Sequence, residues 1–224
     1  MLNDSSATPS AGPSRRLFLK TLAATTTVAA TAACSTTPAA APESLSAAPD
    51  AAAPWFRRAT RWGQINITEA DVQNFDIPWW RQYWRRTRLQ GIILNAGGIV
   101  AYYPSKYPLQ HRPPELGNRD LFGELTAAAH ADGLSVIARM DSSKAYEPLY
   151  RAHPDWFAAD ASGRPFRSGE FYLSCINSPY YSQWLPDIMR EIITRSHPEG
   201  LGDNIWSGVP RSMICACKYC RDRF

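Results

Sequence analysis

Four short apolar or mixed stretches, each followed by a polar residue, constrain the fold of this chain most strongly. They cover residues 62–67, 91–94, 134–140 and 200–202, and the polar residues are Thr68, Asn95, Asp141 and Asp203. Stretches of this length and composition are typical of buried strands in a parallel sheet. Helix-like stretches at 79–88, 120–131 and 182–196 lie between them. This alternation predicts an α/β fold of successive βαβ units, either a barrel or an open doubly wound sheet.

Two features of the segments between the strands favour a barrel over an open doubly wound sheet. A dinucleotide-binding sheet carries a glycine-rich phosphate fingerprint after its first strand, and no such motif follows residue 67. The connection after the third strand is long and contains turn-forming residues such as His153-Pro154 and Ser162-Gly163. It predicts a loop-rich insertion of the kind that shapes a pocket in barrel enzymes.

Residues 1–34 are predicted to be an export signal that does not join the fold. Residues 14–20, Ser-Arg-Arg-Leu-Phe-Leu-Lys, form a twin-arginine pattern before a mildly apolar run of Ala and Thr. Two endings of the signal stay open: a small-x-small cleavage site at 30–32, or a lipobox-like sequence at 31–34 that would lipidate Cys34. We therefore expect the twin-arginine (Tat) export machinery as a partner, and a location in the periplasm or at the outer face of a membrane. Membrane contact would come only through a lipid on Cys34, because no stretch is long and apolar enough to span a bilayer.

The remainder divides into a linker and a folded unit. Residues 35–54 are mostly Ala, Pro, Ser and Thr, which cannot bury a core, so a flexible linker is predicted. The folded unit, 55–224, is shorter than the roughly 250 residues of a typical eightfold βα barrel.

The net charge is only +4 and lies partly in the export signal, so nucleic acid is not an expected partner. Arg81, Arg85 and Arg88 recur at helical spacing and predict the solvated face of a helix.

Five separate motifs resemble one family of enzymes. They are Asn-Ala-Gly-Gly-Ile-Val-Ala-Tyr-Tyr-Pro at 95–104, Ala-Arg-Met-Asp at 138–141, His-Pro-Asp-Trp-Phe at 153–157, Asn-Ser-Pro-Tyr-Tyr at 177–181 and Gly-Asp-Asn at 202–204. In this order they resemble a family of hypothetical, α-L-fucosidase-like glycosyl hydrolases, over residues 62–224. The resemblance implies a TIM barrel. Because members of that family are longer, the chain is expected to hold about the first four βα units of a (β/α)8 barrel.

Asp203 is the candidate catalytic residue. Glycoside hydrolysis needs two carboxyl groups that flank an oxocarbenium-like transition state. A barrel presents such groups at the carboxyl ends of its strands, and the resemblance implies a nucleophile at Asp203. The alternative is that Asp203 forms a turn with Asn204. The second carboxylate is not identified, because Glu170 and Glu199 lack a strand-end position.

Seven other residues are candidates for binding a sugar. Amide and carboxylate groups at strand ends suit hydroxyl recognition, aromatic rings can stack on sugars, and one histidine lies in a loop after the second strand. Capping, loop hydrogen bonds and core packing are the alternatives for each. The candidates are Asn66, Asn95, Tyr102, His111, Asp141, Trp156 and Trp206.

Three cysteines near the carboxyl end have the spacing of a metal site. Cys215, Cys217 and Cys220 form a C-x-C-x-x-C motif, and Cys175 can supply a fourth thiolate. Four thiolates suit a structural Zn²⁺ with no open position for water. The arrangement resembles the zinc site of family 42 β-galactosidases. Disulfides in an oxidising compartment are the competing interpretation, although zinc loaded before twin-arginine export of the folded protein would protect the thiols.

The predicted function is that of an exported glycoside-hydrolase-like protein with carbohydrate as its partner. The parent activity would be hydrolysis of O-glycosidic bonds, and the chain itself is expected to be an inactive fragment. Two alternatives stay open: a carbohydrate-binding lipoprotein that does not cut sugars, and a truncated product without function. Sugar, linkage and stereochemical outcome are not predicted.

Overall fold

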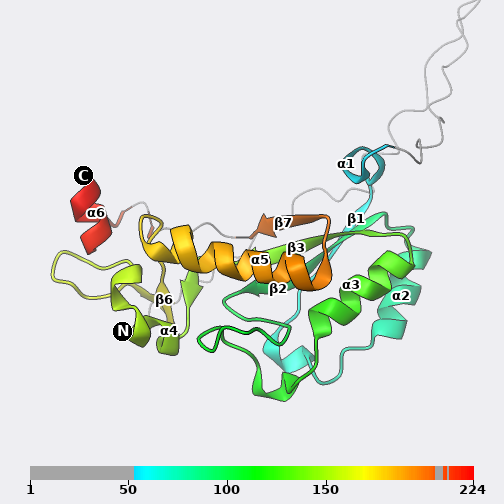
Figure 1. The fold of residues 1–224 in the computed structure, drawn as a ribbon, viewed down its shortest axis with the longest axis horizontal. Coiled ribbons are helices and arrows are strands. Elements are labelled where there is room, and N and C mark those ends of the chain that lie inside the picture. The colour runs from blue at the N-terminus through cyan, green and yellow to red at the C-terminus, as the bar shows by residue number, and fades with distance from the viewer. Residues whose placement is uncertain (1–52, 205–208, 211) are drawn as a thin grey trace, which may run out of the picture. The chain divides into compact units, whose positions relative to one another are not determined.

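A computed structural model describes residues 53–204, 209–210 and 212–224 of the chain. Its centre is a four-stranded sheet, shown in Figure 1, in the order β1-β2-β3-β7 with every neighbouring pair parallel. These strands are β1 (Trp62–Ile65), β2 (Gly91–Gly98), β3 (Ser135–Asp141) and β7 (Gly200–Asp203). All four predicted strands are therefore present, and the predicted α/β fold with a parallel sheet is confirmed.

Strand β2 is longer than the sequence suggested, because it continues past Asn95 to Gly98. The register with β3 shifts between Asn95 and Gly97, so the strand bulges there and then resumes pairing. Gly98 has φ +100°, and a Cβ at this position would lie 2.2 Å from the carbonyl oxygen of Asp141. Only glycine permits this approach, which lets β2 and β3 run together to the edge where polar residues gather.

Helices α2 (Ile77–Arg86), α3 (Leu121–Ala131) and α5 (Leu185–Ser196) connect the strands. Two of them begin with an aspartate cap: Asp76 accepts from the amide of Trp79 at 2.9 Å, and Asp120 accepts from the amide of Gly123 at 2.8 Å. A π-helical segment, η4 (Tyr180–Trp184), precedes α5. Helix α3 packs against β2 and β3 and lies beside α5 (Figure 1).

The alternation of burial along β3 shows that the helices cover one face of the sheet. Val136, Ala138 and Met140 are fully buried, whereas Ile137 and Arg139, which point to the other face, are half-buried. In a complete βα barrel the second face lines the interior. This inward face ends at Asp141, at the carboxyl edge of the sheet.

The predicted insertion lies between β3 and η4 and holds a small sheet of its own. Its three antiparallel strands have the order β4-β6-β5, and helical segments surround them. The elements are β4 (Lys144–Ala145), α4 (Glu147–Ala152), η3 (Pro154–Trp156), β5 (Arg167–Ser168) and β6 (Phe171–Leu173). The rings of Tyr150 and Tyr172 stack at 3.8 Å and tie α4 to β6.

Arg81 and Arg85 reach solvent, with side chains 33% and 56% exposed, and Arg88 just beyond α2 is exposed, as their spacing predicted. Arg81 and Arg85 both bind the carboxylate of Asp132, and the indole of Trp84 donates to the same group at 2.7 Å. The side chain of Asp132 is only 3% exposed. The spacing did not predict this shared carboxylate, because Asp132 follows α3 and only the packing of α3 against α2 brings it within reach.

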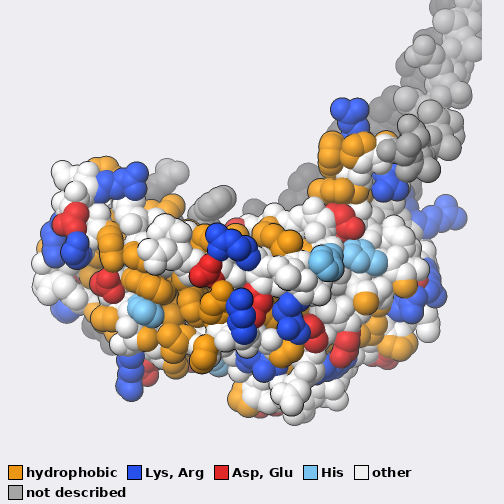
Figure 2. All heavy atoms as spheres, in the orientation of Figure 1, with side chains coloured by type: hydrophobic (Ala, Val, Ile, Leu, Met, Phe, Trp, Pro, Cys, Tyr) orange, Lys and Arg blue, Asp and Glu red, His pale blue; other side chains and the backbone are white. Residues whose placement is uncertain are grey.

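Short segments complete the described structure: η1 (Glu69–Asp71), η2 (Pro114–Leu116), α1 (Trp55–Arg58) and α6 (Lys218–Arg223). Figure 2 shows acidic and basic side chains interspersed over the face on which α3 and α5 lie, where Arg195 pairs with Asp120 at 2.9 Å. No helix in the described ranges is long and apolar enough to cross a bilayer. The predicted export signal, nearly all of the predicted linker, and the candidates Cys34 and Trp206 lie outside the described residues.

Candidate functional site

A cavity of about 370 Å³, here called the edge pocket, lies at the carboxyl edge of the parallel sheet. Its walls come from the segments that follow β1, β2 and β3 and from the insertion. The lining residues are Asn66, Ile67, Thr68, Glu69, Asn95, Ile99, Val100, Tyr102, Arg139, Asp141, Lys144, Tyr146 and Phe171. The volume falls within the usual range for small-molecule sites, and this edge is where βα barrels place their active sites.

Three predicted residues meet in one hydrogen-bond network in this pocket. Asn95, which is 6% exposed, donates from Nδ2 to Asp141 Oδ2 at 3.1 Å and accepts from the amide of Ile67 at 3.1 Å. Arg139 then joins the ends of β1 and β3, because it donates to Asn66 Oδ1 at 2.5 Å and to Asp141 Oδ1 at 3.1 Å. Asn66, Asn95 and Asp141 are thus held in fixed orientations by parallel strand ends that share one edge.

Tyr102 lies in the wall of the same pocket, behind this network. Its hydroxyl donates to the carbonyl oxygen of Ile67 at 2.7 Å, and the residue is 5% exposed. Burial, with nearby carboxylates, raises the pKa of Tyr102 well above its usual value. The phenol therefore stays neutral and fixes the chain after β1 against the segment after β2.

A second cluster at the pocket wall joins Glu69 and Tyr146, which line the pocket, to His111, which does not. Glu69 accepts from the hydroxyl of Tyr146 at 2.5 Å and lies 2.9 Å from His111 Nε2. The His111 and Tyr146 rings contact each other, with centroids 3.9 Å apart. Burial and the hydrogen bond to Glu69 raise the pKa of Tyr146. This cluster places the predicted residue His111 beside the edge pocket.

Sequence reasoning missed Glu69, Arg139, Lys144 and Tyr146. The sequence contained a signal for two of these residues, Glu69 and Arg139. Glu69 immediately follows Thr68 at the end of the first strand, within a capping box in which Thr68 N donates to Asp71 at 2.7 Å. Arg139 is the charged residue within positions 136–140 of β3, which are otherwise apolar, and such a charge needs a polar partner on the same face. Lys144 and Tyr146 reach the pocket only through the fold of the insertion.

Asp203, the candidate catalytic residue, ends β7 opposite Met140. Its carboxylate accepts from the hydroxyl of Ser142, and it accepts from the Ser142 amide at 3.3 Å. Ser142 is fully buried and its hydroxyl also lies 3.3 Å from that of Tyr181. Asp203 is thus held at the same edge of the sheet, but among the described residues it is not one that lines the edge pocket.

Trp156, in η3, is not among the residues that line the edge pocket. Its ring stacks on His153 with centroids 3.8 Å apart. Its carbonyl oxygen accepts from the amide of Cys175 at 2.9 Å and from the hydroxyl of Ser178 at 2.8 Å. The structure therefore joins Trp156 to the segment that carries Cys175, and does not bring it together with the other predicted sugar-binding residues.

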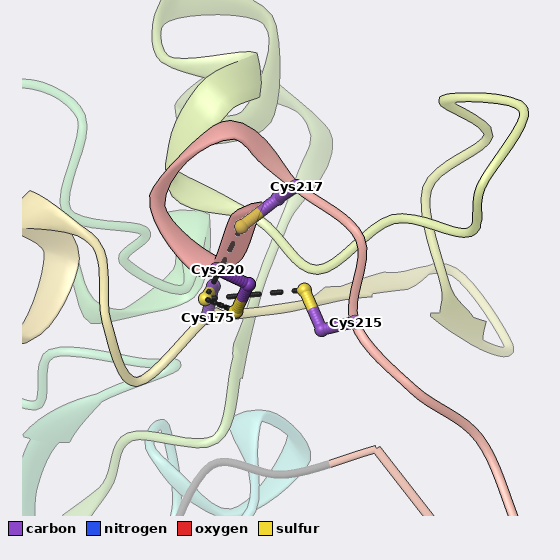
Figure 3. A group of neighbouring side chains, drawn as sticks. All are labelled: Cys175, Cys215, Cys217 and Cys220. Carbon is purple, nitrogen blue, oxygen red and sulfur yellow. Dashed lines mark hydrogen bonds between the residues drawn. The ribbon is translucent and has the colours of Figure 1, made fainter. Parts of the chain in front are cut away.

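The four cysteines of the predicted metal site meet in one cluster (Figure 3). Their sulfur atoms lie within 4.8 Å of one another. Cys175 Sγ is 3.4 Å from that of Cys217, 3.5 Å from that of Cys220 and 3.9 Å from that of Cys215. Four sulfurs around a tetrahedral Zn²⁺ at about 2.3 Å would be about 3.8 Å apart. The donor set and its spacing therefore fit a zinc ion.

Neighbouring groups hold the cysteines in place. Asn177 donates to Cys220 Sγ at 3.3 Å, and Arg223 donates to Asn177 at 3.1 Å. The amide of Ala216 donates to the carbonyl oxygen of Ala159 at 2.7 Å, which attaches the C-x-C-x-x-C segment to the insertion. Hydrogen bonds to a coordinating sulfur are typical of metal sites. All four cysteines are free thiols in this structure.

Comparisons with known proteins agree with a glycosidase-like fold. No curated protein matches the chain. The structure is similar to α-L-fucosidase isoenzyme 2 from Paenibacillus thiaminolyticus, with a TM-score of 0.58 and 22% identity, over 73% of this chain and 25% of that one. It is also similar to a hypothetical protein from Ruminiclostridium thermocellum, with a TM-score of 0.50 and 11% identity, over 64% of this chain and 75% of the other.

At these low sequence identities the two similarities concern the fold alone. The chain spans about a quarter of the length of the fucosidase. The sequence profile named hypothetical glycosyl hydrolase 6 matches residues 82–202. That range is more than half of the chain and contains β2, β3, the insertion and α5. The chain therefore belongs to the hypothetical glycosyl hydrolase 6 family.

Proposed function

We propose that this chain supplies the carbohydrate-binding half of a glycoside-hydrolase barrel, and that a sugar binds in the edge pocket. One observation carries the proposal. Polar side chains from three adjacent strand ends, including Asn66, Asn95 and Asp141, are held by one hydrogen-bond network on a cavity of about 370 Å³. Prearranged donors and acceptors of this kind suit a ligand that carries several hydroxyl groups.

The parent activity that we propose is hydrolysis of an O-glycosidic bond, with Asp203 as nucleophile or acid. Ser142 orients the carboxylate of Asp203 through its hydroxyl and its amide. Such hydrolysis needs a second carboxyl group about 5–10 Å away. We expect little turnover by the chain alone, because the inward face of β3 is half-exposed and cleavage needs a site that excludes water.

Binding without cleavage is the second candidate function. Asp203 is engaged by Ser142 and lies outside the set of residues that line the edge pocket, so the pocket can hold a sugar without it. If the export signal ends at Cys34 and this cysteine is lipidated, this second function would be that of a carbohydrate-binding lipoprotein. The two candidates differ in one measurable respect, which is the role of Asp203.

We also propose that Cys175, Cys215, Cys217 and Cys220 hold a structural Zn²⁺. The sulfur spacing and the hydrogen bond from Asn177 to Cys220 support this assignment. Four thiolates leave no coordination position for water, so the ion would fasten the carboxyl-terminal segment to the insertion and take no part in catalysis.

The experiment is a titration of the full chain with monosaccharides, read by two-dimensional NMR and calorimetry, together with an assay on aryl glycosides. Sugar binding should shift the Asn66 and Asn95 side-chain amides. Asn66→Ala should weaken it about tenfold through loss of a hydroxyl partner, while Asn177→Ala, a control beside the cysteines, should leave it unchanged. Absence of binding by any sugar would reject the proposal.

Asp203→Asn separates the two candidate functions. Under the hydrolase proposal, any turnover by the wild-type chain disappears in Asp203→Asn while sugar binding persists. Equal turnover of aryl glycosides by both forms would show that Asp203 is not the catalytic carboxylate.

A further inference from the structure

A second cavity of about 310 Å³, here called the side pocket, shares a wall with the edge pocket. Ile99 and Tyr146 line both cavities. Glu69 lines the edge pocket and His111 lines the side pocket, and their 2.9 Å contact joins the two walls. The two cavities are therefore neighbours, between the connection after β2 and the insertion.

Most of the side pocket is walled by apolar side chains. Its volume is at the lower end of the range for small-molecule sites. A ligand gains affinity in such a cavity when it buries a methyl or another apolar group there. The apolar residues are Ile99, Pro108, Leu109, Ala145, Pro148 and Leu149.

Gln110 brings an unpaired hydrogen-bond acceptor to this wall. The residue is 5% exposed, and its Nε2 donates to the carbonyl oxygen of Gly98 at 2.8 Å, which fixes the orientation of the amide. Its Oε1 is buried and has no partner among the residues that the structure describes. A buried acceptor without a donor is destabilising. The wall is therefore suited to a ligand that supplies an N–H or O–H group.

Arg112 brings an unpaired donor to the same cavity. One of its terminal nitrogens donates to the carbonyl oxygen of Gly117 at 2.6 Å, whereas its Nε is buried without an acceptor in the described part of the chain. The backbone between the two residues is anchored, because the amide of Ala101 donates to the carbonyl oxygen of His111 at 2.8 Å. One acceptor and one donor thus remain to be satisfied in a mostly apolar pocket.

We propose that the side pocket binds an acylamino group, such as the acetamido group of a 2-acetamido sugar. The N–H of the group would donate to Gln110 Oε1, its carbonyl oxygen would accept from Arg112 Nε, and its methyl would contact Leu109 and Leu149. A hydroxyl could serve the same polar atoms, but it has no apolar part to cover these walls. The inference rests on the proposed function, because the sugar ring itself lies in the edge pocket.

The test compares matched sugars on the full chain by calorimetry. The pairs are N-acetylglucosamine with glucose, N-acetylgalactosamine with galactose, and N-acetyllactosamine with lactose. In at least one pair the acetamido form should bind about fivefold to tenfold more tightly, because it adds hydrogen bonds and a buried methyl. The monosaccharide and disaccharide pairs distinguish a group on the sugar in the edge pocket from one on its neighbour.

Variants assign the preference to the side pocket. Gln110→Met removes the unpaired oxygen at similar size, and Leu109→Trp fills the cavity but leaves Gln110 in place. Both should reduce the preference to less than about twofold while the sugars without the acetamido group bind as before. Gln82→Met is the matched control, because Gln82 is exposed on α2 and lines neither pocket. Thermal unfolding of each variant shows whether the fold is intact.

The outcomes separate this inference from the proposed function. If the two members of every pair bind equally, as they would if a buried water already satisfied Gln110, the selection of an acylamino group is overturned while sugar binding stands. A preference that survives in both variants overturns it as well. If no sugar binds, the proposed function fails and this inference with it.

Discussion

The phenol of Tyr103, at the start of the connection after β2, donates a 2.9 Å hydrogen bond to the carboxylate of Glu191 on α5. Glu191 is 6% exposed and accepts twice more, from the hydroxyl of Ser105 at 2.6 Å and from the amide of Lys106 at 2.6 Å. Three donors satisfy this buried charge, as burial of a carboxylate requires. This contact fixes the connection after β2 to α5, and the same connection carries His111 to its contact with Glu69 beside the edge pocket.

Glu191→Ala should therefore destabilise the protein by about 3 kcal/mol, because it leaves one buried and two partly buried donors without their acceptor. Urea unfolding measures the free energy change. Glu124→Ala is the control, since Glu124 is 44% exposed in its ion pair with Arg119 and should cost less than about 1 kcal/mol. Equal losses for the two variants would show that Glu191 does not anchor the connection.

Asp132 should contribute a pH-dependent share of the stability. The guanidinium of Arg81, with Arg85 and Trp84, holds the pKa of Asp132 well below its usual range. A lowered pKa in the folded state means that the stabilisation is complete above about pH 4, the ordinary range of Asp in an unfolded chain. It is lost as the pH falls through the folded value.

Asp132→Asn should cost about 2 kcal/mol at pH 7, and the gap from wild type should narrow steadily below about pH 4. Chemical denaturation at several pH values measures this. Asp187→Asn, at an exposed pair with Arg190, should cost less than about 1 kcal/mol at any pH. A gap that stays constant down to pH 2 would contradict the assignment.

The cysteine cluster predicts about one zinc per chain in protein purified without chelator. Removal of the ion should lower the melting temperature, because metal binding is coupled to folding of the carboxyl-terminal segment. Cys217→Ser should reduce the zinc content, while Cys34→Ser, outside the cluster, should leave it unchanged. Elemental analysis and thermal unfolding provide the readout. Metal-free protein that holds two disulfides would decide for the oxidised alternative.

Export by the twin-arginine route predicts that Arg15→Lys combined with Arg16→Lys leaves the precursor in the cytoplasm. Cell fractionation measures this, and unchanged export of the double variant would contradict it. Cys34→Ala tests the ending of the signal separately. It should release the protein from membranes only if Cys34 carries a lipid, so a wild-type protein that is already soluble would reject lipidation.

Local patterns in the sequence were sufficient to predict the parallel sheet and its polar edge. The apolar stretches before Asn95 and Asp141 mark strands, and parallel strands place their carboxyl ends together, so these two side chains could be expected to meet. The C-x-C-x-x-C spacing similarly indicated a cluster that includes Cys215, Cys217 and Cys220. The cysteine motif could be predicted because its residues are close in sequence. The strand ends could be predicted because βα connections place parallel strands side by side.

Only the tertiary structure decided which distant groups became partners. Glu69 meets His111 and Tyr146, which are 42 and 77 residues away, and Lys144 enters the pocket through the antiparallel register of β4 and β6. Asp132 becomes buried because α3 packs against α2, which spacing along α2 does not reveal. The sequence by itself determined the sheet, the polar strand ends and the cysteine motif. The charges and the walls of the pocket depend on packing between elements far apart in the chain, and local propensity does not encode that packing.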